Sequence, residues 1–310
     1  ILGLVQTALE LGLISALTVL ALYLSYSMLN VCDLSTDGCF TLGCAVGAML
    51  TIAGHPILAL FAAMAAGMLS GYVTAFLQTR LGVESILAGI ISNTGLYTIN
   101  LAVMGFSSNV SITGVDTVFS LFKGLVGGQW SRLILLALIA AVIVIVLIRF
   151  FGTSLGLSIR ATGDSLDMVS ASSINPKATI TIGLCLANAL TALSGCLIGE
   201  YNKFCDINLG TGMVTIALAS LIIGEVFAGR RGGVVKRVVC VVLGSIVYRF
   251  IIALALRLNI SAEYFKLVSA VIVAVAIAAP NMKGYIRLAK IKSNARKLRA
   301  LSGKGDETDA

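Results

Sequence analysis

The chain has 310 residues, of which 58% are hydrophobic and only 12% are charged. A soluble domain has about twice that charged fraction, so the composition excludes an ordinary soluble globular protein. Because a helix needs about 20 largely apolar residues to cross a bilayer, the sequence predicts a membrane protein with many spans. The net charge of +8 does not indicate nucleic-acid binding, because the basic residues are distributed among the connections between apolar segments.

Nine apolar segments follow one another along the chain and predict an all-α, polytopic transmembrane helical bundle of about nine spans. The segment at 40–54 is short for a full crossing, which indicates a half-helix that completes a broken span with residues 33–38. We expect a membrane domain over 1–282 and a basic cytoplasmic tail over 283–310. The predicted spans cover about 9–29, 40–54, 57–79, 86–105, 132–151, 178–200, 211–228, 237–257 and 264–281.

Lys and Arg concentrate in the cytoplasmic connections of membrane proteins. With nine spans, sixteen basic residues fall on the side of the 152–177 connection and the tail, against five on the other side. The sequence therefore predicts a cytoplasmic C-terminus and an N-terminus outside. Residues 106–131 then lie outside, and they contain an amphipathic stretch at Thr117–Leu125.

The 152–177 connection is long enough to carry structure of its own. Asp164 or Ser165 can cap a short helix that runs to about Ser172, and Asn175-Pro176 breaks the chain before the next span. This helix is either an ordinary surface helix or one that docks into a groove on another subunit.

The chain also resembles itself. Ala16–Leu34 and Ala189–Ile207 share an A-L-T triplet, two later leucines and a C-D pair without gaps. The two copies lie in the first and the sixth predicted spans, so they run in opposite directions through the membrane. This is the inverted repeat typical of transporters, whose substrate passes at the interface between the repeats. The repeats would cover about 9–105 and 178–281.

Polar residues within or beside spans are the first candidates for a transport path, because burying them in lipid is costly. Acidic residues and their neighbours occupy the two breaks that follow the repeated segments, and two asparagines lie within spans. The alternative roles are helix caps at the water interface for the former and bonds between helices for the asparagines. The candidate path residues are Asp33, Ser35, Asp37, Asn93, Asn188, Asp206 and Asn208.

Nothing in the sequence indicates catalysis. It has no Walker A loop, nucleophile elbow, H-E-x-x-H motif or dinucleotide fingerprint. The seven cysteines form no C-x-x-C pair and there is one histidine, which argues against a zinc site. We therefore expect no catalytic residues, no cofactor and no metal, and active transport would draw its energy from an ion gradient or from a partner.

Several stretches resemble, in the same order, the permease subunits of ABC importers in the branched-chain amino acid and ribose permease superfamily. The chain is most similar to the tryptophan/tyrosine-type permeases, from about Leu11 to Pro280. The stretches that carry the resemblance are Asp33–Gly43 (DLSTDGCFTLG), Ser85–Gly105 (SILAGIISNTGLYTINLAVMG), Ile159–Asn175, Ala187–Ser194 (ANALTALS), Asp206–Glu225 and Leu243–Leu258 (LGSIVYRFIIALALRL).

In such permeases an R-A-T-G-D motif and the short helix after it engage the ATPase. The resemblance therefore assigns an ATPase-coupling role to Arg160, Gly163, Asp164, Ser165, Leu166, Met168, Val169 and Ile174. The chain departs from the family at Ser173, where a glycine is usual, and at Glu200–Lys203, where the family tends to be uncharged. The second departure puts in doubt any substrate assigned from the subfamily alone.

The resemblance implies the transmembrane subunit of a bacterial ABC importer in the cell (inner) membrane. It implies three partners: a cytoplasmic ABC ATPase, an extracytoplasmic substrate-binding (lipo)protein and a second copy of the chain in a homodimer. It favours an aromatic or other amino acid as substrate, with a nucleoside, a sugar or a riboflavin-like vitamin as alternatives. An ion-coupled secondary transporter would also have inverted repeats, and it remains the alternative class.

Overall fold

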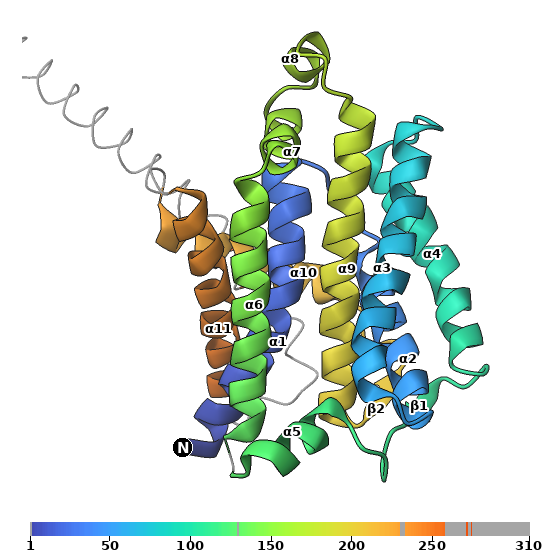
Figure 1. The fold of residues 1–310 in the computed structure, drawn as a ribbon, viewed down its shortest axis with the longest axis vertical. Coiled ribbons are helices and arrows are strands. Elements are labelled where there is room, and N and C mark those ends of the chain that lie inside the picture. Colours follow the sequence, from blue (N-terminus) through green and yellow to red (C-terminus); the bar gives the residue numbers. More distant parts are fainter. Residues whose placement is uncertain (1, 129, 230–232, 258–270, 272–273, 275–310) are drawn as a thin grey trace, which may run out of the picture.

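Eight of the nine predicted segments form helices in the computed structural model, which describes residues 2–128, 130–229, 233–257, 271 and 274. The predicted ninth span at 264–281, apart from residues 271 and 274, and the predicted tail at 283–310 lie outside the described residues. The helices run side by side in a bundle (Figure 1), as expected for an all-α membrane domain.

The long helices follow the predicted spans closely. They are α1 (Leu2–Leu22), which continues into a π-helical turn η1 (Tyr23–Met28), α2 (Thr36–Ile52), α3 (Pro56–Thr79), α4 (Ser85–Val103), α6 (Ser131–Phe151), α9 (Pro176–Asn202), α10 (Met213–Ala228) and α11 (Val234–Arg257). In the described part of the chain, 6 helices are long and apolar enough to cross a membrane, whereas α2 and α10 are shorter. The expected count of nine spans is therefore not exact.

Short elements close the two ends of the bundle. At one end lie α7 (Ser154–Asp164) and α8 (Leu166–Ala171), and at the other lie α5 (Val118–Val126) and an antiparallel pair of strands, β1 (Asn109–Ser111) and β2 (Phe204–Asp206) (Figure 1). We call the first the basic end, because Arg80, Arg149 and Lys177 lie at helix termini there. We call the other the strand end.

Three side chains cap helices in the connections, and the predicted cap of the short helix is one of them. Thr117 caps α5 and forms a capping box with Ser120, and the Asn175 side chain caps α9 at the N–H of Lys177. Ser165 caps α8, whereas Asp164 is the last residue of α7. The helix α7 was not predicted, because its sequence mixes glycine, serine and threonine with few apolar residues.

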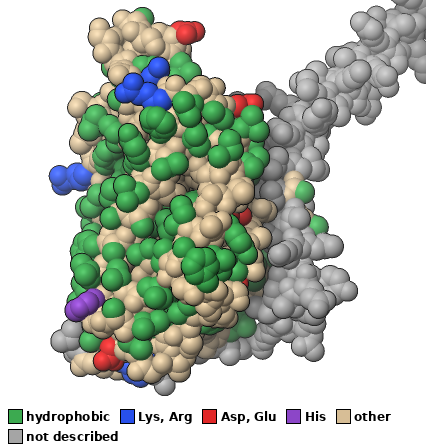
Figure 2. Space-filling view, turned by 90° about the vertical axis from the view of Figure 1, so that its right-hand side faces the viewer, with side chains coloured by type: hydrophobic (Ala, Val, Ile, Leu, Met, Phe, Trp, Pro, Cys, Tyr) green, Lys and Arg blue, Asp and Glu red, His purple; other side chains and the backbone are tan. Residues whose placement is uncertain are grey.

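The centre of the bundle is formed by α1 and α9. Of the residues in their most apolar stretches 78% and 83% are buried, against 22% in α6. Figure 2 shows the face formed by α3 and α4, where hydrophobic side chains cover the middle of the surface. Phe61 and Leu69 are 66% and 68% exposed there, as expected for side chains that face lipid.

Small residues let α9 approach its neighbours closely. A Cβ atom at Gly195 would collide with the carbonyl oxygen of Phe40 in α2, and one at Gly43 would collide with the carbonyl oxygen of Ala192. On the other side, a Cβ atom at Gly71 of α3 would lie 2.5 Å from the carbonyl oxygen of Leu184. These contacts fix α2 and α3 against α9.

We predict that Gly195→Ala destabilises the protein by about 1–3 kcal/mol, because the added methyl group forces α2 away from α9. Gly95→Ala is the matched control, since nothing lies within 4 Å of a Cβ atom at this glycine of α4. The melting temperatures of the two variants in the same detergent test this. Equal melting temperatures would show that the close contact between α2 and α9 is absent.

Candidate transport path and coupling surface

The two short helices start beside each other near the middle of the bundle. The Asp37 carboxylate, in the first turn of α2, accepts hydrogen bonds from the backbone N–H groups of Gly212 (2.9 Å) and Val214 (2.9 Å), where α10 begins. From this point α2 runs to the strand end and α10 runs to the basic end, where Ser27 bonds Glu225 (2.6 Å). Each helix therefore crosses only part of the bundle.

The break between η1 and α2 is held by Asp33. One carboxylate oxygen accepts from the N–H (2.8 Å) and hydroxyl (2.6 Å) of Ser35, and the other accepts from the Asn188 side chain (2.8 Å). Asp33, Ser35 and Asn188 are 2%, 0% and 1% exposed. The structure thus joins three of the predicted path residues in one buried cluster that fixes the break against α9.

The break between α9 and α10 is more open. Asp206 accepts from the N–H of Asn208 (2.8 Å) and lies at the strand end, paired with Asn109. After Asp206 and up to Gly212 the backbone forms neither a helix nor a strand. Asn208 and Thr211 on this stretch are exposed. Irregular backbone at membrane depth must be covered by protein or line a water-filled space.

The two asparagines of α4 lie against the start of α2. Asn93 is half-buried, and its side-chain oxygen lies where a Cβ atom of Gly38 would stand. The neighbouring Asn100 is buried and donates to the Gly38 carbonyl oxygen (3.0 Å). Asn93, the predicted path residue on α4, therefore lies beside Gly38, the residue that follows Asp37 in α2.

The predicted coupling residues divide into two groups. Arg160, Asp164, Leu166 and Met168 are exposed, and the two apolar side chains among them are 53% and 67% exposed at the tip of the basic end. Exposed apolar side chains at the tip of a connection are typical of a surface that docks a partner. Ser165 is half-buried and caps α8.

The remaining coupling residues hold the connection to the bundle. Val169 is 1% exposed, and its carbonyl oxygen accepts from the N–H of Ile174 (3.3 Å). Gly163 lies directly against the backbone carbonyl of Met28 in η1. The Thr162 hydroxyl, beside it, bonds that of Thr179 in α9 (2.8 Å). A movement of α7 therefore acts directly on η1 and on α9.

Sequence reasoning missed two buried carboxylates near the strand end. Glu200 of α9 accepts from the Thr51 hydroxyl (3.1 Å) and from the N–H of Val118 (2.8 Å), which joins α2 and α5 to α9. Glu10 of α1 accepts from the Tyr201 hydroxyl (2.9 Å). A charged residue inside an apolar segment was the available signal for both.

Arg249 also finds a partner within the bundle. Its guanidinium donates to the Ser15 hydroxyl of α1 (3.2 Å), which lies 3.1 Å from the Ser245 hydroxyl. These hydrogen bonds join α11 to α1.

These helices, breaks and ends define a polytopic membrane protein of the permease class. The family described as branched-chain amino acid transport system, permease component, matches residues 4–277. The chain belongs to this family of ABC-type transport permeases, as the resemblance of its sequence implied.

Two curated relatives cover nearly the whole chain. A tyrosine transport system permease protein of Clostridioides difficile (strain R20291) is 31% identical over 286 residues, which are 92% of each chain. An uncharacterized protein of Rickettsia prowazekii (strain Madrid E) is 30% identical over 274 residues, 87% of this chain and 95% of the relative. No solved structure matches the chain significantly.

We predict that Asp33→Ala lowers the stability by about 1–3 kcal/mol, because it leaves the buried donors of Ser35 and Asn188 without an acceptor. Asp206→Ala is the matched control from the other break, since this carboxylate bonds only its own loop among the bonds that the described residues show. The melting temperatures of the Asp33→Ala and Asp206→Ala variants in the same detergent test this, and the melting temperature of Asp33→Ala should be the lower. A loss for Asp206→Ala as large as that for Asp33→Ala would contradict the difference between the breaks.

Proposed function

We propose that the chain is the transmembrane subunit of a bacterial ABC importer for an amino acid, with an aromatic amino acid as the favoured substrate. The observation that carries the transport role is the break from Asn208 to Gly212, where the polar residues Asn208 and Thr211 are exposed and which ends beside Asp37 at the start of α2. In a membrane this stretch needs water or a second subunit beside it, and both conditions are met by a path between two copies of the chain. The relative named as a tyrosine permease supports the substrate class.

The substrate would pass along the half-exposed and exposed polar residues near the start of α10. Asp37, Asn93 and Asn208 are the path residues that we assign to this surface, with Asp206 at its entrance. The buried cluster of Asp33, Ser35 and Asn188 would hold the break in shape without touching substrate. Because the chain carries none of the ATPase motifs considered above, the energy would come from a separate ATPase.

The basic end would be cytoplasmic, in agreement with the distribution of Lys and Arg, and the N-terminus would lie outside. There the exposed Leu166 and Met168 offer an apolar contact for the ATPase. A displacement of α7 and α8 by the ATPase would move η1 through the contact at Gly163. It would move α9 through the hydrogen bond of Thr162. A π-helical turn is a weak point in a helix and often lies at a functional site, so η1 is suited to transmit this movement to the break at Asp33.

At the strand end a substrate-binding protein would dock on the outer connection that contains α5. Glu200 ties this helix to α2 and α9, so docking there would act on both halves of the molecule. ATP and the docked receptor can change the conformation only if each binds one state more tightly than the other.

The experiment is reconstitution of the chain with its ATPase and binding protein. We predict that Leu166→Asp/Met168→Asp reduces co-purification of the ATPase at least about tenfold and abolishes uptake of tyrosine. Two charges in an apolar contact cost several kcal/mol, whereas both side chains are exposed in the chain alone, so insertion and folding should persist.

Leu121→Asp is the control, because this leucine is 41% exposed on α5 at the opposite end of the bundle. It should leave ATPase binding unchanged. Normal ATPase binding and uptake by the α8 variant would contradict the coupling assignment. Uptake that ignores ATP but collapses with an uncoupler would contradict the ABC importer itself.

A further inference from the structure

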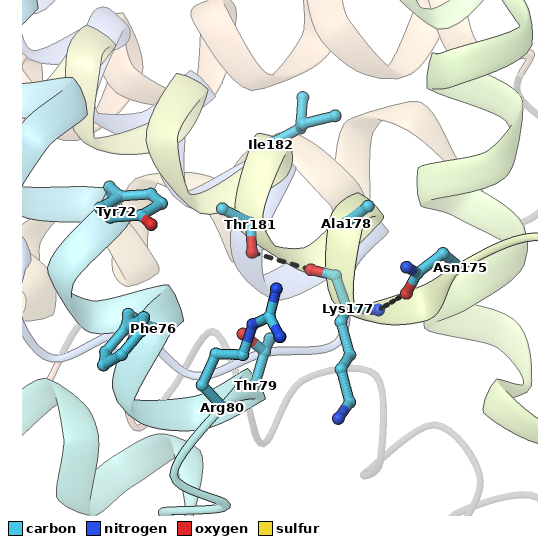
Figure 3. Close-up of a pocket in the computed structure, with 9 residues that line it drawn as sticks. All are labelled: Tyr72, Phe76, Thr79, Arg80, Asn175, Lys177, Ala178, Thr181 and Ile182. Carbon is cyan, nitrogen blue, oxygen red and sulfur yellow. Dashed lines mark hydrogen bonds between the residues drawn. The ribbon is translucent and has the colours of Figure 1, made fainter.

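A pocket opens between α3 and α9 at the basic end. The two helices touch at Gly71 and Leu184, and beyond this contact they diverge around a space of about 320 Å³ (Figure 3). Side chains of both helices line it, among them Tyr72, Phe76, Arg80, Lys177, Thr181 and Ile182.

Two cations face the pocket from different helices. Arg80 follows the last turn of α3, and its guanidinium extends toward α9 in Figure 3, while Lys177 lies in the first turn of α9. Both side chains are exposed, and neither has an ion pair or a side-chain hydrogen bond among the described residues. A lysine at a helix N-terminus is electrostatically unfavourable, so an anion here would be stabilised by both cations and by the start of α9.

The surface that continues from the pocket toward the middle of the bundle is apolar. Tyr72 and Phe76 lie one turn apart with ring centroids 6.4 Å from each other. Leu69 and Val73, on the same helix, are 68% and 53% exposed. A ligand that fits both parts is anionic at one end and apolar along its length.

We propose that this pocket binds the phosphate group of an anionic glycerophospholipid whose acyl chains lie along α3. Basic pockets between membrane helices at the cytoplasmic side are suited to anionic head groups, and aromatic side chains are typical of the depth at which head groups lie. The proposal rests on the chain spanning a membrane and on the cytoplasmic position of the basic end proposed above. Because Asn175 follows α8 by a few residues and also lines the pocket, the bound lipid joins α3 to the exit of the 152–177 connection.

Native mass spectrometry of the full chain, released from detergent with added lipid, tests this. The wild type should retain one phosphatidylglycerol per chain in preference to phosphatidylcholine. Arg80→Gln/Lys177→Gln should weaken phosphatidylglycerol binding at least about tenfold, because both cations that attract the anionic head group are lost. Arg80→Lys/Lys177→Arg keeps both charges and should keep the binding.

Arg149→Gln/Lys236→Gln is the matched control, because these exposed cations lie at the same end but do not line the pocket. It should bind phosphatidylglycerol like the wild type. The proposal is overturned if the pocket variant binds phosphatidylglycerol like the wild type, or if the control loses as much affinity. Displacement of the lipid by excess inorganic phosphate would also overturn it, in favour of a site for free phosphate.

Discussion

The hydrogen bonds from Gly212 and Val214 to the Asp37 carboxylate are the interaction on which the rest of the structure depends. A helix that begins inside a membrane exposes N–H groups that lipid cannot satisfy, at a cost of several kcal/mol for each group. Asp37 accepts two of them, and Thr41 accepts the N–H of Gly210 (3.1 Å). The carboxylate in turn lies at the positive end of the α10 dipole. The start of α10 thus depends on two side chains of α2.

This junction connects the parts of the molecule that a transporter must move together. The predicted inverted repeat would place α2 and α10 at equivalent positions in opposed halves, and their opposite directions from one junction support it. Toward the basic end the chain leads from the junction through the cluster at Asp33 to η1, and η1 touches α7 at Gly163. The π-helical turn η1 therefore lies between the surface proposed for the ATPase and the surface proposed for the substrate.

Features of local origin could be predicted from the sequence. The apolar segments predicted the helices because a bilayer requires them, and Ser165 was recognisable as a cap because a capping side chain bonds the first turn of its own helix. Long-range contacts could not be predicted. The pairing of β1 with β2 and the bonds of Glu200 join residues 82 to 149 positions apart along the chain, and no local pattern specifies such partners. The buried cluster among the path candidates likewise depends on the bond between Asp33 and Asn188, which are 155 positions apart.

Amide hydrogen exchange at the start of α10 tests the central claim most directly, because exchange reports the opening of individual hydrogen-bonded segments. If Asp37 holds this helix, Asp37→Ala should accelerate exchange in the peptide that contains Gly212 and Val214, although the substitution lies in α2. The end of α10 should keep its protection, and Asp167→Ala, at an exposed carboxylate of α8, should change neither. Unchanged exchange at Gly212 and Val214 in Asp37→Ala would contradict the junction of the two half-helices.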